Sequence, residues 1–156
     1  MKKFELTTEF ITNVLGKKLF RIKALVEFGN VKAGELGGYV EKEGNVSQSG
    51  NAWVSGNAKV SGNAEVSGNA RVSGNAEVSG NADYALVQGF GTKFRCTTFY
   101  RGKNKKIMVN CGCFHGDLEE FRKQVKETRS GKIAKEYLMI ADLMKYHFAS
   151  EDSSDE

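Results

Sequence analysis

The chain has 156 residues, which corresponds to one ordinary domain or two small ones. Hydrophobic residues make up 40% and charged residues 27%, a balance typical of a globular protein that excludes a disordered one. Its 18 glycines without any proline argue against a linker-rich or collagen-like chain. The formal net charge is +4, and it rises to +8 when the acidic side chains of residues 151–156 are set aside.

The basic balance favours an acidic partner, such as nucleic acid, a nucleotide or an acidic protein face. A soluble basic protein without such a partner has the same balance, so this alternative stays open. Residues 1–9 are polar, and nowhere do about 18 apolar residues follow one another. We therefore expect a cytoplasmic protein without membrane contact, whose odd number of cysteines stays reduced.

The N-terminal segment, residues 1–32, is expected to supply a strand that caps the next part of the chain. Its first half is polar, and a strand is predicted at 18–26 because apolar residues then occupy every second position. The start of this strand is basic, with Lys17, Lys18, Arg21 and Lys23.

A six-residue repeat dominates the middle of the chain. The pair Asn-Ala recurs at positions 51, 57, 63, 69, 75 and 81, and Val recurs at 54, 60, 66, 72 and 78. A period of six fits neither an α-helix nor a coiled coil. Ala and Val lie two apart and point to one side of an extended segment, while Ser-Gly-Asn supplies a bend. Each hexad is therefore predicted to be a short strand plus a corner, stacked as a parallel β-helix.

Two looser hexads, 45–50 and 33–38, precede the regular ones, and Leu36 falls in the phase of the valines. The repeat resembles the left-handed β-helix family of hexapeptide-repeat proteins, in which three hexads form one coil of 18 residues. This resemblance implies a short left-handed parallel β-helix over residues 33–87. It also implies self-association, because hexapeptide coils commonly form trimers.

An 18-residue coil predicts which outward residues are neighbours. Trp53 is expected to stack with Arg71 on an exposed face that could join subunits of a homo-oligomer. Lys59 is expected beside Glu77, and Glu65 beside Asp83. Enzymes of the resembled family use histidines in or near the coils, whereas His115 and His147 lie outside the repeat. We therefore expect no catalysis and no cofactor, with an acyltransferase-like enzyme as an alternative.

After residue 87 the periodicity changes. A strand at 93–100, a turn at 101–104 and a returning strand to Phe114 predict a hairpin. Asp117 and Glu120 have the spacing of a capping box at a helix start, and a second helix is predicted at 132–148. We thus expect a ββαα domain over 88–149 and a disordered acidic tail at 150–156. The predicted fold class is mainly β with an α+β C-terminus.

Three thiols and one imidazole are weak candidates for a zinc site. Cys111, Cys113 and His115 lie two residues apart on a predicted strand, and Cys96 on the partner strand could face them. The spacing differs from that of a zinc knuckle, and buried free cysteines are the favoured interpretation, so no metal is expected.

The predicted hairpin is basic and carries interleaved aromatic rings, which suits phosphate contact and base stacking. A solvated hairpin with its aromatic residues in the core, or docking on an acidic protein face, are the alternatives. The candidate binding residues for nucleic acid or an acidic partner are Lys93, Arg95, Tyr100, Arg101, Lys103, Lys105 and Lys106.

The order of these segments over residues 17–148 resembles that of hexapeptide-repeat proteins common in phages and prophages. This resemblance implies a non-catalytic binding protein, acting in the host cytoplasm, whose β-helix presents a basic C-terminal domain to a host partner. Inhibition of a host or defence protein is the implied outcome. Binding of nucleic acid or a nucleotide through the basic hairpin is the main alternative.

Overall fold

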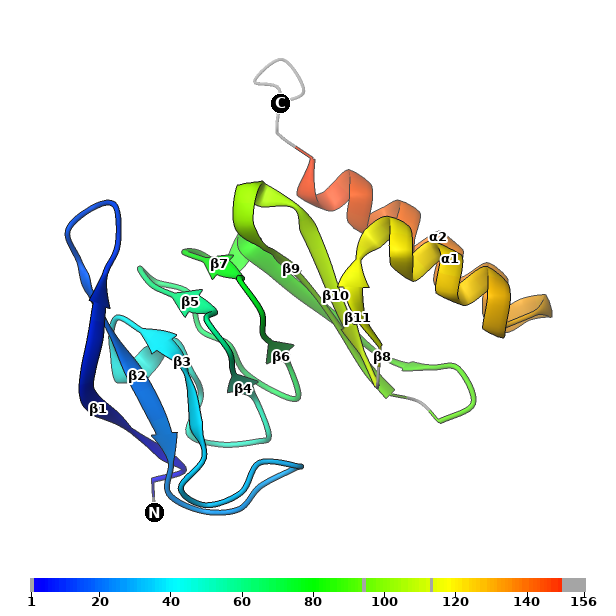
Figure 1. Cartoon of the computed structure of the whole chain (residues 1–156). Helices are drawn as coiled ribbons and strands as arrows, with labels where there is room; N and C mark the ends of the chain where they lie inside the picture. Colours follow the sequence, from blue (N-terminus) through cyan, green and yellow to red (C-terminus); the bar gives the residue numbers. More distant parts are fainter. Residues whose placement is uncertain (1, 94, 113, 150–156) are drawn as a thin grey trace.

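The computed structural model describes residues 2–93, 95–112 and 114–149, and it is a mixed α/β fold with three sheets and two helices (Figure 1). A five-stranded mixed sheet has the order β1-β2-β3-β5-β7. Its strands are β1 (Phe4–Thr12), β2 (Lys18–Ala24), β3 (Leu36–Val40), β5 (Lys59–Val60) and β7 (Glu77–Val78). A two-stranded parallel sheet joins β4 (Trp53–Val54) and β6 (Arg71–Val72).

The C-terminal part is a four-stranded antiparallel sheet of order β11-β10-β9-β8, covered on one face by two helices (Figure 1). These elements are β8 (Tyr84–Phe90), β9 (Arg95–Arg101), β10 (Ile107–Cys111), β11 (Phe114–Asp117), α1 (Leu118–Thr128) and α2 (Gly131–Phe148). Short 3-10 turns lie at Glu43–Asn45, Asn81–Asp83 and Lys103–Lys105.

The hexads stack with the predicted 18-residue register. Trp53 pairs with Arg71, and Lys59 pairs with Glu77, both in parallel. The Ala and Val side chains of the regular hexads point inward and are at most 1% exposed. The alternation of buried and outward positions within each hexad is therefore confirmed, and burial of these side chains holds the layers together.

The predicted fold class is nevertheless wrong. The hexad strands are two residues long and are divided between two sheets, so the repeat is not a separate β-helix. β5 and β7 extend the sheet that begins with the antiparallel strands β1, β2 and β3. The C-terminal part contains four strands before its helices, where the sequence suggested two. β8 begins at Tyr84, because the last hexad changes from Val-Ser-Gly to Tyr-Ala-Leu.

The phase assigned to the loose hexads is also wrong. Leu36 is 50% exposed, whereas Val40 and Val46 are buried beneath Val60 and Val66. The step from Val46 to Val54 is therefore eight residues long, two more than in the regular repeat. Gln48 lies in this longer step, and its side chain accepts hydrogen bonds from the backbone N–H groups of Lys3 and Phe4. The extra residues thus attach the N-terminal strand to the stack.

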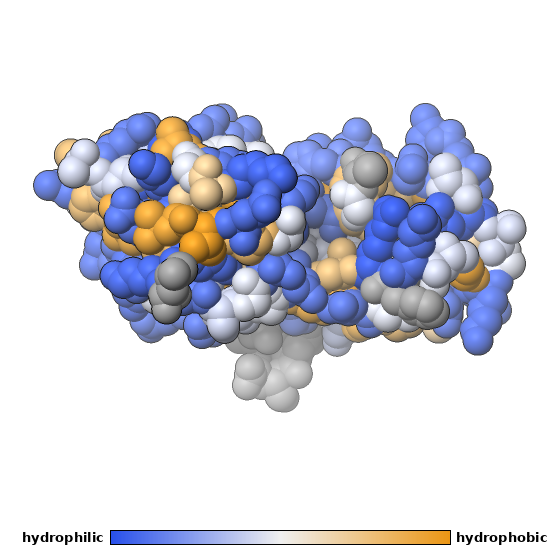
Figure 2. Space-filling model, turned by 90° about the horizontal axis from the view of Figure 1, so that it is seen from below, coloured by the Kyte–Doolittle hydropathy of each residue, from blue (hydrophilic) through white to orange (hydrophobic). Residues whose placement is uncertain are grey.

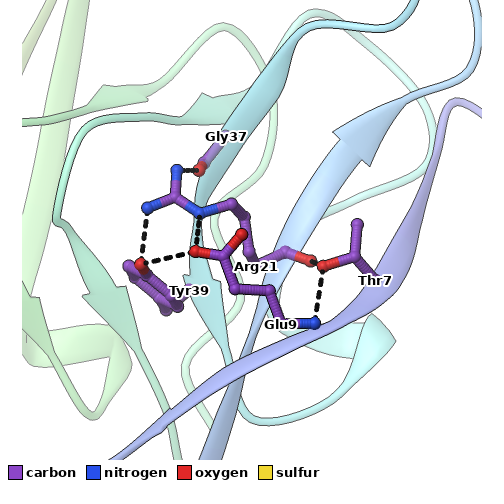
Figure 3. A network of polar contacts seen from close by, with 5 residues as sticks. All are labelled: Thr7, Glu9, Arg21, Gly37 and Tyr39. Atoms are coloured by element: carbon purple, nitrogen blue, oxygen red, sulfur yellow. Dashed lines mark hydrogen bonds and ion pairs between the residues drawn. The ribbon is translucent and has the colours of Figure 1, made fainter.

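β1 was not predicted, and it pairs with β2 as a long antiparallel hairpin. Arg21 on β2 fastens this hairpin to β3, as Figure 3 shows. Its Nε donates to Glu9 Oε2 at 3.0 Å, its Nη1 donates to the Gly37 carbonyl at 3.0 Å, and its Nη2 donates to the Tyr39 hydroxyl. One guanidinium therefore joins three strands.

The hairpin predicted at 93–114 is confirmed in β9 and β10, which pair with Val109 opposite Phe99. The capping box is also confirmed, because Asp117 Oδ1 accepts from the Glu120 N–H at 2.8 Å. α2 spans the predicted helix, and its apolar face packs with α1 on the sheet. The predicted disordered tail, residues 150–156, lies outside the described residues.

Polar contacts fix the C-terminal sheet against the last layer of hexads. The Arg71 N–H donates to Thr98 Oγ1 at 3.0 Å, and Asn110 Nδ2 donates to the Arg71 carbonyl at 2.8 Å. Tyr100 is fully buried and belongs to the core of the repeat, although it lies on β9. The hairpin, the repeat and the C-terminal sheet therefore have a defined spacing, and this spacing creates a cleft.

Candidate binding cleft

A cleft of about 980 Å³ lies between the β1–β2 hairpin and the C-terminal sheet. The hairpin tip and the β9–β10 turn rise on either side of β5 and β7 (Figure 1). One wall is formed by Thr12–Leu15 and Leu19, and the other by Asp83, Arg101, Lys105 and His147. The floor is the outer edge of the hexads, with Lys59, Ser61, Glu77 and Ser79. Three parts of the chain that are remote in sequence thus face one space.

The hairpin tip presents two apolar side chains to solvent. Val14 is 101% exposed and Leu15 is 81% exposed. Asn13 holds this shape, because its Oδ1 accepts hydrogen bonds from the N–H groups of Leu15 and Lys17, each at 3.0 Å. A turn held in this way keeps both side chains out of the core. Large apolar side chains exposed together on a fixed loop are typical of an interaction site.

The opposite wall is held by Arg101. Its Nε donates to Asp83 Oδ1 at 2.8 Å, and its Nη1 donates to the Phe148 carbonyl at the end of α2 at 3.0 Å. Burial tends to raise the pKa of Asp83, but hydrogen bonds from Ser79 and Arg101 outweigh it and lower that pKa below its usual value. Asp83 therefore stays ionised, and the pair braces the wall.

The remaining cations of the cleft are not neutralised by ion pairs within the described residues. Lys105 lies in the β9–β10 turn, where both Asn104 and Lys105 have positive φ angles, of 62° and 61°. This conformation is uncommon for residues other than glycine, and here it accompanies an exposed lysine in the cleft lining. Lys59 is paired with Glu77 in strand register, but the two form no ion pair. The cleft thus combines an apolar wall with a cationic one.

The residues predicted to form one basic binding surface on the hairpin do not lie together as free, exposed side chains. Tyr100 is fully buried, so it cannot stack on a base. Arg101 is engaged by Asp83, and the Lys106 ammonium lies 2.9 Å from Asp117 Oδ2. Lys103 and Lys105 remain exposed in the β9–β10 turn.

Lys93 and Arg95 lie at the other end of β9. The strand between the two ends has seven residues, which corresponds to roughly 20 Å. The predicted nucleic-acid surface is therefore divided into two separate basic sites. Among its predicted residues, only Arg101 and Lys105 line the cleft. Phe94, expected to interleave with these cations, lies outside the described residues.

The prediction that Trp53 and Arg71 form an exposed oligomer face is wrong, because other parts of the chain cover both side chains. Trp53 is 2% exposed and packs edge-on against Phe28 and Phe4. Arg71 is half-buried, and its guanidinium donates to Asn30 Oδ1. The β1 strand and the β2–β3 connection cover this side of the repeat, so the indole is not available to a second subunit.

The weak zinc candidates are also separated. β10 ends at Cys111 and β11 begins at Phe114, so Cys111 and His115 lie on different antiparallel strands. Thr97 Oγ1 donates to Cys111 Sγ at 3.1 Å, and His115 Nε2 bonds to the Tyr100 hydroxyl at 3.0 Å. Cys96 is partly buried, and burial raises the pKa of its thiol. Cys113 lies outside the described residues, which contain no cluster of metal ligands.

Exposed apolar side chains also occur away from the cleft. Leu25 and Leu36 are 39% and 50% exposed. Seen from below, the molecule is largely hydrophilic, with a hydrophobic area over its N-terminal half (Figure 2). The cleft differs from such areas because its apolar tip stands opposite cations.

Sequence reasoning missed the hairpin tip. A local signal was present, because Asn13 and Gly16 are turn formers between two segments of strand length. Comparison with known proteins adds no assignment: no protein-family model matches this chain, and no curated protein matches it. Among the described residues, no helix is long and apolar enough to cross a membrane.

Proposed function

We propose that the protein is a non-catalytic binding protein that holds a segment of a partner protein in the cleft. The observation that carries this proposal is the arrangement of its walls, in which Val14 and Leu15 face Lys105 and His147 across a polar floor. Apolar contact supplies affinity, and complementary charge supplies orientation and specificity.

The chemistry of the cleft describes the segment that it fits. An apolar side chain of the partner would pack on Val14 and Leu15, and a carboxylate a few residues away would reach Lys105 or Lys59. A short acidic-apolar stretch of an extended chain meets both demands. The braced pair of Arg101 and Asp83 keeps the cationic wall in place, so little ordering is needed on binding.

The resemblance to phage and prophage proteins supports a bacterial host protein as this partner. A protein that occupies a recognition segment of host machinery or of a defence system blocks that segment for other partners. Inhibition is therefore the biological outcome that we propose.

Site-specific photo-crosslinking in bacterial lysate tests the proposal. A photo-reactive amino acid is placed at Leu15, in the cleft, and in a second protein at Lys123, which lies on α1 away from it. The expected result is one host protein crosslinked from position 15 and not from position 123. The same protein should be lost from position 15 when Val14→Ser removes the neighbouring apolar side chain, or when Lys105→Glu reverses the charge.

Lys126→Glu provides the matched control, because it reverses an exposed charge on α1. Capture that is equal in Lys105→Glu and in the wild type overturns the proposal. Crosslinks that disappear after nuclease treatment would instead identify nucleic acid, and crosslinks only to further copies of the chain would identify self-association. Both outcomes contradict a host protein in the cleft.

A further inference from the structure

A second, smaller pocket lies on the other side of the C-terminal sheet, where the helices cover it. Its volume is about 100 Å³. The end of α1 contributes Thr128, the following turn contributes Arg129, β9 contributes Arg95, and β10 contributes Cys111. This pocket is remote from the cleft and plays no part in the proposed function.

Two arginines flank this pocket without an acidic partner. Within the described residues, neither Arg95 nor Arg129 forms an ion pair, whereas Arg21, Arg101 and Arg122 all do. Arg95 rests directly against the backbone of Gly112, where a Cβ atom would lie only 2.1 Å from Arg95 Nη1. The missing side chain at Gly112 therefore allows this guanidinium to lie at the pocket. Both arginines are exposed, and two guanidiniums that line one small hollow suit an anion that accepts from both.

The pocket also contains a tyrosine hydroxyl group. Tyr137 lines it and is 4% exposed as a residue. Its hydroxyl is not among the buried side-chain atoms that lack a partner in the described residues, and it can donate a hydrogen bond to an anion that enters the pocket. Burial raises the pKa of Tyr137, the nearby Cys111 and Glu136 raise it further, and Arg129 and Arg95 oppose this rise. Both positive charges are therefore within electrostatic reach of the hydroxyl, which stays protonated and able to donate.

The rest of the lining is aromatic. Phe121 packs edge-on against Tyr137 with ring centroids 5.9 Å apart, and Phe114 lies 5.7 Å from Phe121. These rings fix the position of Tyr137, and they exclude water from one side of the pocket. Hydrogen bonds to an anion are stronger where water is excluded.

From this arrangement we infer that the pocket binds a phosphate group, as the free ion or as a small monoester. A phosphate monoester carries close to two negative charges, which two guanidiniums match, and a third oxygen can accept from Tyr137. A carboxylate carries only one negative charge, so it matches two guanidiniums less well than a phosphate does. The free ion and the ester share this chemistry, and the aromatic rings would favour an aromatic ester.

Calorimetric titration of the whole protein with inorganic phosphate and with phenyl phosphate tests this inference, with benzoate as the carboxylate probe. We expect one site for phosphate or its ester and no site for benzoate. Tyr137→Phe retains the ring and removes only the hydroxyl, and it should weaken binding about tenfold. Arg129→Gln should abolish measurable binding, whereas Lys123→Gln, which removes an equal charge elsewhere on α1, should leave it unchanged.

The outcomes separate the two sources of phosphate. Equal affinity for both probes identifies the free ion, and tighter binding of phenyl phosphate identifies an aromatic ester. Absence of binding by the wild type overturns the inference, as does tighter binding of benzoate. An equal loss in Arg129→Gln and Lys123→Gln would show general charge attraction instead of a site. Circular dichroism of each variant establishes that a loss of binding is not a loss of fold.

Discussion

Trp53 and Arg71 are directly paired across β4 and β6, yet their side chains turn to different partners. The indole packs against Phe28, with ring centroids 5.3 Å apart and planes at 74°, while the guanidinium donates to Asn30. The indole Nε1 is buried without a hydrogen-bond partner within the described residues. The pair therefore marks where the β2–β3 connection closes over the repeat.

This burial predicts the fluorescence of the protein, because Trp53 is its single tryptophan. The emission maximum should lie at a shorter wavelength than that of free tryptophan. Acrylamide should quench the emission weakly in the native protein and strongly once guanidinium has unfolded the chain. Quenching that is as strong in the native protein as in the unfolded one would place the indole in water and contradict the packing against Phe28.

From the surroundings of Lys3 we expect the free energy of unfolding to increase with pH in the alkaline range. Its ammonium donates to the backbone carbonyls of Ser49, Gly50 and Ala52. Burial, together with the nearby charge of Arg71, lowers the pKa of Lys3 from 10.5 to about 8. Between these two values the unfolded chain binds the proton more tightly than the folded one, so the free energy of unfolding should rise with pH.

Urea unfolding from about pH 7 to about pH 10 measures this rise, with Lys3→Met as the comparison. The wild type should gain more stability than Lys3→Met over this window, because the variant has no ammonium to lose. Parallel pH profiles for the two proteins would mean that the pKa of Lys3 is not lowered.

The corners of the hexads predict a difference between two equivalent glycines. Gly62 and Gly68 have positive φ angles of 61° and 63°, so Ala at either position should cost about 1–2 kcal/mol of backbone strain. A Cβ atom at Gly62 would also lie 2.5 Å from the Ser79 carbonyl oxygen, whereas one at Gly68 meets no atom within 4 Å. Gly62→Ala should therefore lose clearly more stability than Gly68→Ala in denaturant unfolding. Equal losses would argue against the stacking of Gly62 on the layer of Ser79.

The N-cap of α1, Asp117, is expected to contribute to the stability of the protein. The hydrogen bond from the Lys106 ammonium, with that from the Glu120 N–H, lowers the pKa of Asp117. Asp117→Ala should destabilise the protein by about 1 kcal/mol at neutral pH, while Glu119→Ala in the same turn should have a smaller effect. The difference in stability between the wild type and Asp117→Ala should be present at pH values above the ordinary pKa of an aspartate. It should vanish as the pH falls through the lowered pKa of Asp117. Thermal unfolding at several pH values checks both points.

Sequence reasoning succeeded where the repeat is regular and failed where it is not. From Asn51 to Gly80 each hexad has the form Asn-Ala-x-Val-Ser-Gly in the same phase, so the buried positions of one layer predict those of the next. Before Asn51 the longer step around Gln48 shifts the phase, and only its bonds to Lys3 and Phe4 explain the shift. The cleft could not be predicted, because Val14 and Lys105 are separated by most of the chain and share no local pattern. The separation of Lys93 from Lys105 likewise follows from the length of β9.

The 18-residue register of the hexads makes the repeat a spacer of adjustable length. Inserting three further hexads after Gly68 would add one layer between the N-terminal hairpin and the C-terminal sheet, and the two would move apart by about 4.8 Å. Neither wall of the cleft would change its own residues. Gain or loss of hexads in threes is therefore a simple genetic route by which proteins of this construction could match the width of one cleft to different partners.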